Sequence, residues 1–92
     1  MIKTFAHKAL ERFFLNGDRR GLNAQHLPRI ERILDRLDAA LQATDMDLPG
    51  YGFHRLVGNR QDTYSLKVSG NWRITFRFQD GDALAVNLED YH

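Results

Sequence analysis

The side chains that could do chemistry in this sequence are its four histidines, its arginines and its carboxylates, because it contains no cysteine. Without cysteine the chain can form no disulfide, thiolate metal site or cysteine nucleophile, which fits a reducing compartment. His54 lies in a basic stretch, and His92 follows Asp90 by two positions at the end of the sequence. His7 and His26 stand where helices are expected to begin, an ordinary place for an exposed histidine, and we assign them no role.

Histidine and arginine together can cleave an RNA chain without a metal ion. The reaction needs a base that deprotonates the 2′-hydroxyl, a cation for the charge developing on the phosphorane, and an acid for the 5′-oxygen leaving group. The positive neighbours Arg55 and Arg73 favour the neutral form of His54, which suits the base. Asp90 and a terminal carboxylate favour the protonated form of His92, which suits the acid. Local charge alone supports this assignment, so the roles of His54, Asp90 and His92 as base or acid stay open.

The basic residues collect in one segment, although the whole chain has a formal net charge of only +1, which argues weakly for a nucleic-acid partner. Between Tyr51 and Phe78, a single aspartate stands against five basic residues: Arg55, Arg60, Lys67, Arg73 and Arg77. The planar guanidinium group suits bidentate phosphate contacts. Arg73 alternates with apolar neighbours, so it should project from the strand face opposite the core and could clamp a phosphate. An ordinary solvated strand face is the alternative.

A metal site is another interpretation of the end of the sequence, because Asp90 and His92 lie two residues apart and both residue types bind metals. No third ligand stands at a recognisable spacing, so we expect no metal and no other cofactor. The segment Gly58-Asn59-Arg60 could grip a phosphate or could simply be a turn.

The elements that must position these residues follow from the hydrophobic pattern. Ninety-two residues, 42% of them hydrophobic, suit a single domain spanning residues 1–92. An alternating run at 2–5 predicts a short strand, and helical spacing predicts a helix over 6–15, followed by a loop at 18–23. The second helix, with Pro28 in its first turn, has an apolar face made by Ile30, Ile33, Leu34, Leu37 and Leu41. Residues 45–52 form the only linker-like stretch.

After residue 52 the hydrophobic period changes to two, which predicts strands at 53–57, 64–68, 72–78 and 84–88, with turns at 69–70 and 80–81. We therefore predict an α+β fold in which two N-terminal helices pack on one face of a mainly antiparallel sheet. The predicted order is β-α-α-β-β-β-β, and the other face of the sheet stays open. Strict alternation would point Asp90 and His92 into the core, so we expect the last strand to end, bend or bulge after Leu88.

Three motifs resemble the HigB toxins of the RelE/ParE superfamily, the plasmid maintenance killer proteins of type II toxin-antitoxin systems. They are Gly58-Asn59-Arg60, the run from Val68 to Phe76 with Asn71-Trp72-Arg73 inside it, and the terminal Glu89-Asp90-Tyr91-His92. The resemblance spans the whole chain, since the opening residues 1–5 and the order of elements also agree. The combination of Asn-Trp-Arg with a terminal Asp-Tyr-His makes the resemblance specific.

The resemblance implies a RelE-like microbial ribonuclease-type fold and a ribosome-dependent mRNA endoribonuclease, or mRNA interferase. It also implies a HigA-like helix-turn-helix antitoxin, the bacterial ribosome and mRNA as partners, with operator DNA bound only through the antitoxin complex. Matching positions imply catalytic or substrate-contacting roles for His54, Arg73, Asp90, Tyr91 and His92. The basic residues expected to bind RNA are Arg55, Arg60, Lys67 and Arg77. Related toxins often carry further basic residues near the positions of Val57 and Ser69, which this chain lacks.

Two other functions are compatible with the same superfamily. A ParE-like toxin poisons DNA gyrase by binding it and needs no catalytic histidine. A noncatalytic module binds the ribosome or RNA without cutting it. We expect a cytoplasmic protein with no membrane partner, because charge appears too early for a signal peptide and no apolar run is long enough to span a membrane.

Overall fold

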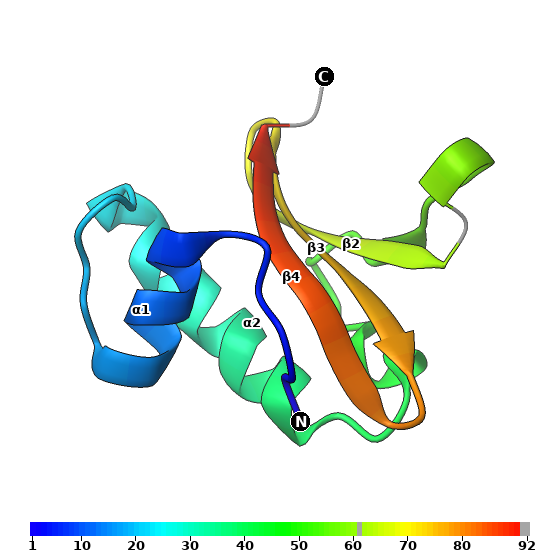
Figure 1. Cartoon of the computed structure of the whole chain (residues 1–92). Coiled ribbons are helices and arrows are strands. Elements are labelled where there is room, and N and C mark those ends of the chain that lie inside the picture. The colour runs from blue at the N-terminus through cyan, green and yellow to red at the C-terminus, as the bar shows by residue number, and fades with distance from the viewer. Residues whose placement is uncertain (61, 91–92) are drawn as a thin grey trace.

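The computed structural model describes residues 1–60 and 62–90, which form helices on one side of a four-stranded antiparallel sheet (Figure 1). In chain order the elements, with η denoting a 3₁₀ turn, are α1 (Lys8–Asn16), η1 (Ala24–His26), α2 (Leu27–Ala39), η2 (Ala43–Met46), β1 (His54–Arg55), η3 (Gly58–Arg60), β2 (Thr63–Ser69), β3 (Trp72–Gln79) and β4 (Asp82–Asp90). The strands are neighbours in the order β1-β2-β3-β4. The predicted α+β class is therefore confirmed. No helix in the described ranges is long and apolar enough to cross a membrane.

The first helix begins two residues later than predicted because His7 caps it. The Nδ1 atom of His7 accepts a hydrogen bond from the backbone N–H of Leu10 at 3.2 Å. This bond satisfies one of the N–H groups that have no partner inside the helix. Gly17 ends the helix in the left-handed conformation, with φ of 70°.

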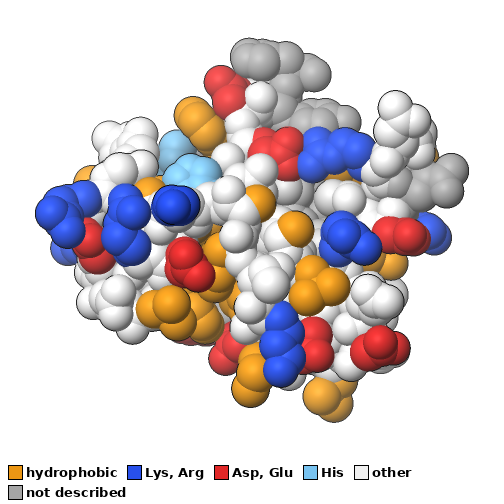
Figure 2. Space-filling view, in the orientation of Figure 1, with side chains coloured by type: hydrophobic (Ala, Val, Ile, Leu, Met, Phe, Trp, Pro, Cys, Tyr) orange, Lys and Arg blue, Asp and Glu red, His pale blue; other side chains and the backbone are white. Residues whose placement is uncertain are grey.

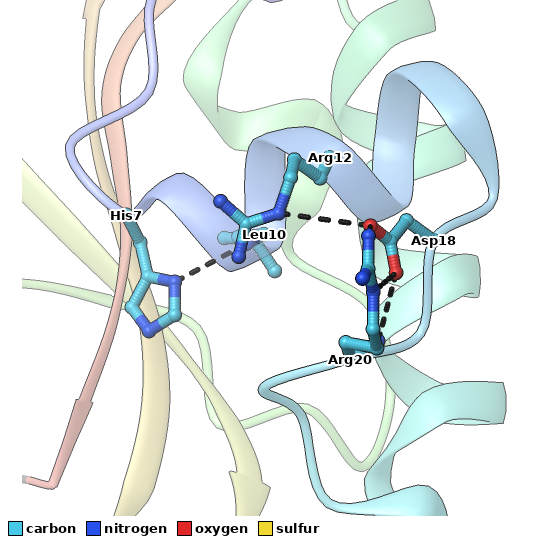
Figure 3. A network of polar contacts seen from close by, with 5 residues as sticks. All are labelled: His7, Leu10, Arg12, Asp18 and Arg20. Atoms are coloured by element: carbon cyan, nitrogen blue, oxygen red, sulfur yellow. Dashed lines mark hydrogen bonds and ion pairs between the residues drawn. The ribbon is translucent and has the colours of Figure 1, made fainter.

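The loop after α1 is held by one carboxylate, that of Asp18 (Figure 3). Asp18 accepts hydrogen bonds from Nε and Nη2 of Arg20 at 3.0 and 2.8 Å, and its Oδ2 lies 3.7 Å from Nε of Arg12. The side-chain hydrogen bonds of Arg20 are the largest cause that holds the pKa of Asp18 well below its ordinary range. The network links residues 18–20 to the last turns of α1.

The second helix packs its apolar face on the sheet, as predicted, with one exception. Leu41, which helical spacing assigns to this face, is 82% exposed. That prediction is wrong because the helix ends at Ala39, and Ala40 then adopts an extended backbone with φ of −68° and ψ of 140°. Ala40 is buried in place of Leu41. The buried residues of the helix itself are Leu27, Ile30, Ile33, Leu34 and Leu37.

The segment predicted as a linker contributes to the core. It begins inside η2, whose last residue, Met46, is fully buried. The carboxylate of Asp45 accepts hydrogen bonds from the backbone N–H groups of Leu41 and Gln42 at 2.9 and 3.1 Å. These bonds hold the turn that carries Met46 under the helices.

The two faces of the sheet differ as the alternation predicts. In the hairpin of β2 and β3, Leu66 lies opposite Ile74, and both side chains are fully buried against the helices. Phe76 continues the buried row, where its ring lies 5.7 Å from that of Tyr64. The hydrophobic core therefore lies between the helices and one face of the sheet (Figure 1).

The last strand contains a bulge that the alternation did not reveal. Two residues of β4, Ala85 and Val86, lie opposite the single residue Phe76 of β3. Ala85 has a positive φ of 52°, which is uncommon for alanine. Because of the extra residue, Ala83 rather than Leu84 is fully buried before the bulge. Strict alternation through the strand predicted at 84–88 would place Leu84 in the core with Val86 and Leu88, and the bulge makes that placement wrong.

Beyond the bulge, β4 continues past the point where the sequence predicted its end. Its pairing with β3 stays regular from Leu88 to Asp90, which lies opposite Trp72. The prediction of an end, bend or bulge after Leu88 is therefore wrong, because the irregularity comes earlier in the strand. Asp90 is exposed, since the end of β4 extends beyond the helices (Figure 1).

The first five residues lie along β4 without forming the predicted strand (Figure 1). Ile2 and Phe5 each make one isolated parallel bridge to β4. The bulge interrupts the pairing between them, and the N–H of Ala85 donates to the hydroxyl oxygen of Thr4 at 2.7 Å instead of to a backbone carbonyl. The strand predicted at 53–57 is also shorter, covering His54–Arg55.

Replacing Ala85 with glycine should raise the free energy of unfolding by about 0.5–1 kcal/mol. Alanine in the left-handed region costs about 1–2 kcal/mol more than glycine. The greater freedom of glycine in the unfolded chain offsets about 0.4–1 kcal/mol of that gain. Urea unfolding measures the change. The matched control is Ala83→Gly, because Ala83 is fully buried and has no positive φ, so glycine there should lower stability. Equal decreases in the free energy of unfolding in Ala85→Gly and Ala83→Gly would contradict backbone strain at Ala85.

Candidate functional site

The sheet face that the helices leave uncovered carries a band of polar side chains, which we call the open face. Cross-strand pairing aligns them in two rows, one made by His54, Ser65, Thr75 and Asn87 and the other by Lys67, Arg73 and Glu89. Arg77 projects from the same face of β3, opposite Thr63. The strands therefore bring four of the predicted site residues together on the open face: His54, Lys67, Arg73 and Arg77.

Other predicted site residues lie elsewhere. Arg55 is on the opposite side of β1 by alternation and makes an ion pair with Asp62 at 3.1 Å. Asp90 is on the other side of β4, at its exposed end. Tyr91 and His92 lie outside the described residues. Nor do three potential metal ligands meet anywhere within residues 1–60 and 62–90.

Glu89 is the centre of a polar network on the open face. Arg60, from η3, donates two hydrogen bonds to its carboxylate, from Nη1 to Oε1 at 3.0 Å and from Nη2 to Oε2 at 2.5 Å. Thr75 donates its hydroxyl hydrogen to the same Oε2. The bonds from Arg60 are the largest cause that holds the pKa of Glu89 below its ordinary value, against the opposing effect of burial. Arg60 thus reaches the open face as one half of an ion pair.

His54 is oriented so that its Nε2 atom can act as a base. Its Nδ1 atom lies 3.1 Å from the carbonyl oxygen of Gly52, which can only accept a hydrogen bond. The neutral imidazole therefore carries its proton on Nδ1 and its lone pair on Nε2. The hydroxyl oxygen of the fully buried Ser65 lies 3.5 Å from both ring nitrogens. The ring rests on the sheet at Ser65 and remains exposed to solvent.

Arg73 projects from the central part of the sheet. It is half-buried, between Lys67 on β2 and Glu89 on β4. β3 is paired on both sides, so the backbone that carries Arg73 is held by hydrogen bonds to two strands. A guanidinium group on such a rigid element can stabilise negative charge at a defined position. Together with the imidazole of His54, it gives the open face two of the three groups that RNA cleavage without a metal needs, a base and a cation.

The whole chain is similar to known proteins of one kind. Residues 3–92 match the HigB-like toxin family, described as RelE-like toxin of type II toxin-antitoxin system HigB. The chain belongs to this family. It is 42% identical over 92 residues to the Endoribonuclease HigB of Proteus vulgaris, with 100% of both chains covered. It is 32% identical over 93 residues to Toxin HigB-1 of Vibrio cholerae serotype O1 (strain ATCC 39315 / El Tor Inaba N16961), with 99% of this chain and 98% of that protein covered.

In this HigB-like toxin, four residues of the open face were not predicted as site residues: Ser65, Thr75, Asn87 and Glu89. Glu89 alternates with Leu88, so its face could be read from the sequence. Its contact with Arg60 could not, because the two residues are 29 positions apart. Ser65 and Thr75 have the residue types of ordinary surface strand positions, yet they are 0% and 1% exposed. Other side chains of the open face cover them.

The Glu89 ion pair predicts a part of the stability that depends on pH. The pKa of Glu89 is lower in the folded chain than in the unfolded chain, whose ordinary value is 4.5. The pair therefore stabilises the fold above that pH, and the stabilisation disappears as the pH falls through the folded-state pKa. We expect Glu89→Gln to be less stable than the parent near neutral pH, and the difference should narrow in acid. Urea unfolding across this range measures both. A difference that persists unchanged in acid would show that packing rather than charge is lost.

Proposed function

We propose that this toxin cleaves mRNA on the bacterial ribosome as a metal-independent endoribonuclease. The observation that carries the proposal is that His54, with its lone pair on Nε2, shares the open face with Arg73. The relative from Proteus vulgaris supports it, because that protein is named an endoribonuclease and is 42% identical over the full chain.

The proposed roles follow from the chemistry of RNA cleavage through the 2′-hydroxyl. The Nε2 atom of His54 takes the proton of the 2′-hydroxyl, whose oxygen attacks the adjacent phosphorus. Arg73 stabilises the negative charge that develops on the phosphorane. The bond from phosphorus to the 5′-oxygen then breaks, and an acid donates a proton to that oxygen. The products are a 2′,3′-cyclic phosphate end and a 5′-hydroxyl end.

The acid in this proposal comes from the end of the sequence. His92 is the proposed donor, with Asp90 favouring its protonated form and Tyr91 contacting the substrate. Of the other basic residues, Lys67 and Arg77 lie on the open face and bind phosphates on either side of the cleaved bond. Arg60 is held by Glu89 and Arg55 lies on the opposite side of β1, so for these two we propose a contribution to RNA binding away from the cleaved bond.

The proposed partners are those of a type II toxin. They are a HigA-like helix-turn-helix antitoxin, the bacterial ribosome and mRNA, and operator DNA is reached only through the antitoxin complex. We also propose that residues 1–92 act as one toxin domain in the cytoplasm.

Primer extension on an mRNA in a purified translation system tests the proposal. The protein is added with and without ribosomes, and new 5′ ends are mapped and examined for a 5′-hydroxyl group. Ends that need the ribosome, carry a 5′-hydroxyl and disappear with Arg73→Ala are expected. Intact mRNA would overturn the proposal.

Two contrary results would each identify another function. Double-strand DNA breaks in expressing cells, with mRNA intact, would indicate a ParE-like poison of DNA gyrase. Protection of ribosomal RNA without new mRNA ends would indicate a noncatalytic ribosome-binding or RNA-binding module.

A further inference from the structure

A small cavity lies on the helix side of the sheet, where β3 begins and β4 ends. Its volume is about 160 Å³, and its main lining residues are His7, Leu22, Asn23, His26, Trp72 and Leu88. None of them belongs to the open face. In Figure 2 histidine side chains gather on the visible surface close to apolar side chains. We call the cavity lined by these six residues the Trp72 cavity.

The walls of the Trp72 cavity suit a flat aromatic ring. Trp72 is the only tryptophan in the sequence and is 38% exposed, although it lies on the same face of β3 as the fully buried Ile74 and Phe76. The ring of His26 lies 6.4 Å from the indole ring and is tilted by 56° to it. The volume is close to that of a cavity of about 150 Å³ that holds one benzene ring. Exposed aromatic side chains of this kind are the surfaces on which unpaired nucleic-acid bases stack.

The polar groups of the cavity supply hydrogen-bond donors. The Nδ1 atom of His7 accepts from the N–H of Leu10, so neutral His7 carries its proton on Nε2. The side-chain oxygen of Asn23 accepts from the N–H of Gln25 at 2.9 Å, so the donor of that side chain is its NH₂ group. The capping bonds thus orient both side chains as donors. Ring nitrogens and carbonyl oxygens of nucleobases are the matching acceptors.

The cavity lies next to the proposed phosphate clamp. Trp72 directly precedes Arg73 in β3, and successive strand residues point to opposite faces of the sheet. The cavity and Arg73 are therefore on opposite faces of the same strand end. An RNA chain that is held at Arg73 and continues over this end of the sheet brings a base to the cavity.

We propose that the Trp72 cavity binds one nucleobase of the RNA and thereby contributes to the choice of cleavage position. The identity of the RNA as substrate rests on the proposed function above. Binding of a free nucleoside to the cavity does not rest on the proposed function, because it requires neither the ribosome nor RNA cleavage.

Tryptophan fluorescence tests the proposal directly, because Trp72 is the only tryptophan. The purified protein is titrated with each of the four ribonucleosides, and its fluorescence is excited at a wavelength that the nucleosides do not absorb. Ribose is the matched ligand that lacks a base. We expect saturable quenching by at least one nucleoside and none by ribose. His26→Ala, which removes a wall but no capping side-chain bond, should weaken the affinity at least about fivefold. Leu22→Phe, which fills the cavity, should weaken it as well. Gln79→Ala, exposed at the far end of β3, is the control and should not change it.

Three results would overturn the proposal. The first is the absence of quenching by any of the four nucleosides. The second is quenching that is unchanged in both cavity variants, with folding of each verified by circular dichroism. The third is that nucleosides have no effect while both variants lose affinity for the antitoxin, which would identify a protein side chain as the occupant.

The outcome is separable from that of the proposed function. Quenching by nucleosides with intact mRNA would refute cleavage and leave the cavity proposal standing. Cleavage of mRNA without quenching by any nucleoside would refute the cavity proposal and leave the proposed function standing. If both hold, His26→Ala should change the ratio of cleavage rates between mRNA positions by at least about fivefold.

Discussion

Replacing Arg73 with alanine should slow mRNA cleavage on the ribosome by at least about a hundredfold, the effect typical of removing one group that stabilises transition-state charge. Arg73 is half-buried between Lys67 and Glu89 on a strand paired on both sides, so its guanidinium group is carried at a defined position of the open face. Single-turnover primer extension with ribosome-bound mRNA measures the loss. The variant should keep its fold, because the side chain projects from the open face.

Two further variants separate the role of Arg73 from a general loss of positive charge. Arg73→Lys keeps the charge but loses the planar fork, so its rate should lie between those of the parent and Arg73→Ala. Arg77→Ala removes an exposed arginine from the same face of the same strand, two positions away, and should have a much smaller effect. Equal losses in Arg77→Ala and Arg73→Ala would contradict a specific clamp and indicate nonspecific attraction of RNA.

The second large effect is expected for His54→Ala, which should slow cleavage by about 10²–10⁴-fold, as for the loss of a general base. The reason is the orientation of the ring, whose Nδ1 proton is directed to the carbonyl of Gly52 and whose Nε2 lone pair is left for the substrate. Ser65→Ala is the matched control. It removes the hydroxyl beneath the ring but no reacting group, so its effect should be several-fold at most.

The pH dependence of the rate distinguishes the base from the acid. A base must be deprotonated, so the rate of the parent should rise with pH on the acid side, and His54→Ala should remove that limb. If His92 is the acid, His92→Ala should remove the opposite limb. Loss of the same limb in both variants would contradict the proposed division of roles.

Regular alternation was enough to predict the part of the site on the central strand. From Arg73 to Arg77, β3 pairs with β2 from Lys67 to Thr63 without a shift of register, so the face of Arg73 could be predicted from its apolar neighbours. His54 could be placed in a strand for the same reason. The helices were also readable, because the apolar stripe of α2 has the helical period.

Local irregularities could not be predicted from the sequence, because the residue types at these positions do not indicate them. Ala85 takes a left-handed conformation that glycine or asparagine usually signals, and so Leu84 was assigned to the wrong face. Ala39 and Ala40 favour helix, yet the helix stops between them and exposes Leu41. The ion pair of Arg60 with Glu89 depends on the path of η3 over the sheet, which tertiary structure alone determines.

The position of the first five residues along β4 bears on when the fold can form. Thr4 bonds to Ala85 across 81 positions of sequence, so the beginning and the end of the chain stabilise each other. A growing chain that still lacks residues 82–90 also lacks Ala83 and Val86 of the core and the strand that holds its own N-terminus. Contacts of such long sequence separation form late. Because β4 supplies Glu89 and part of the core, a fragment of this toxin that ends before residue 82 has no assembled open face.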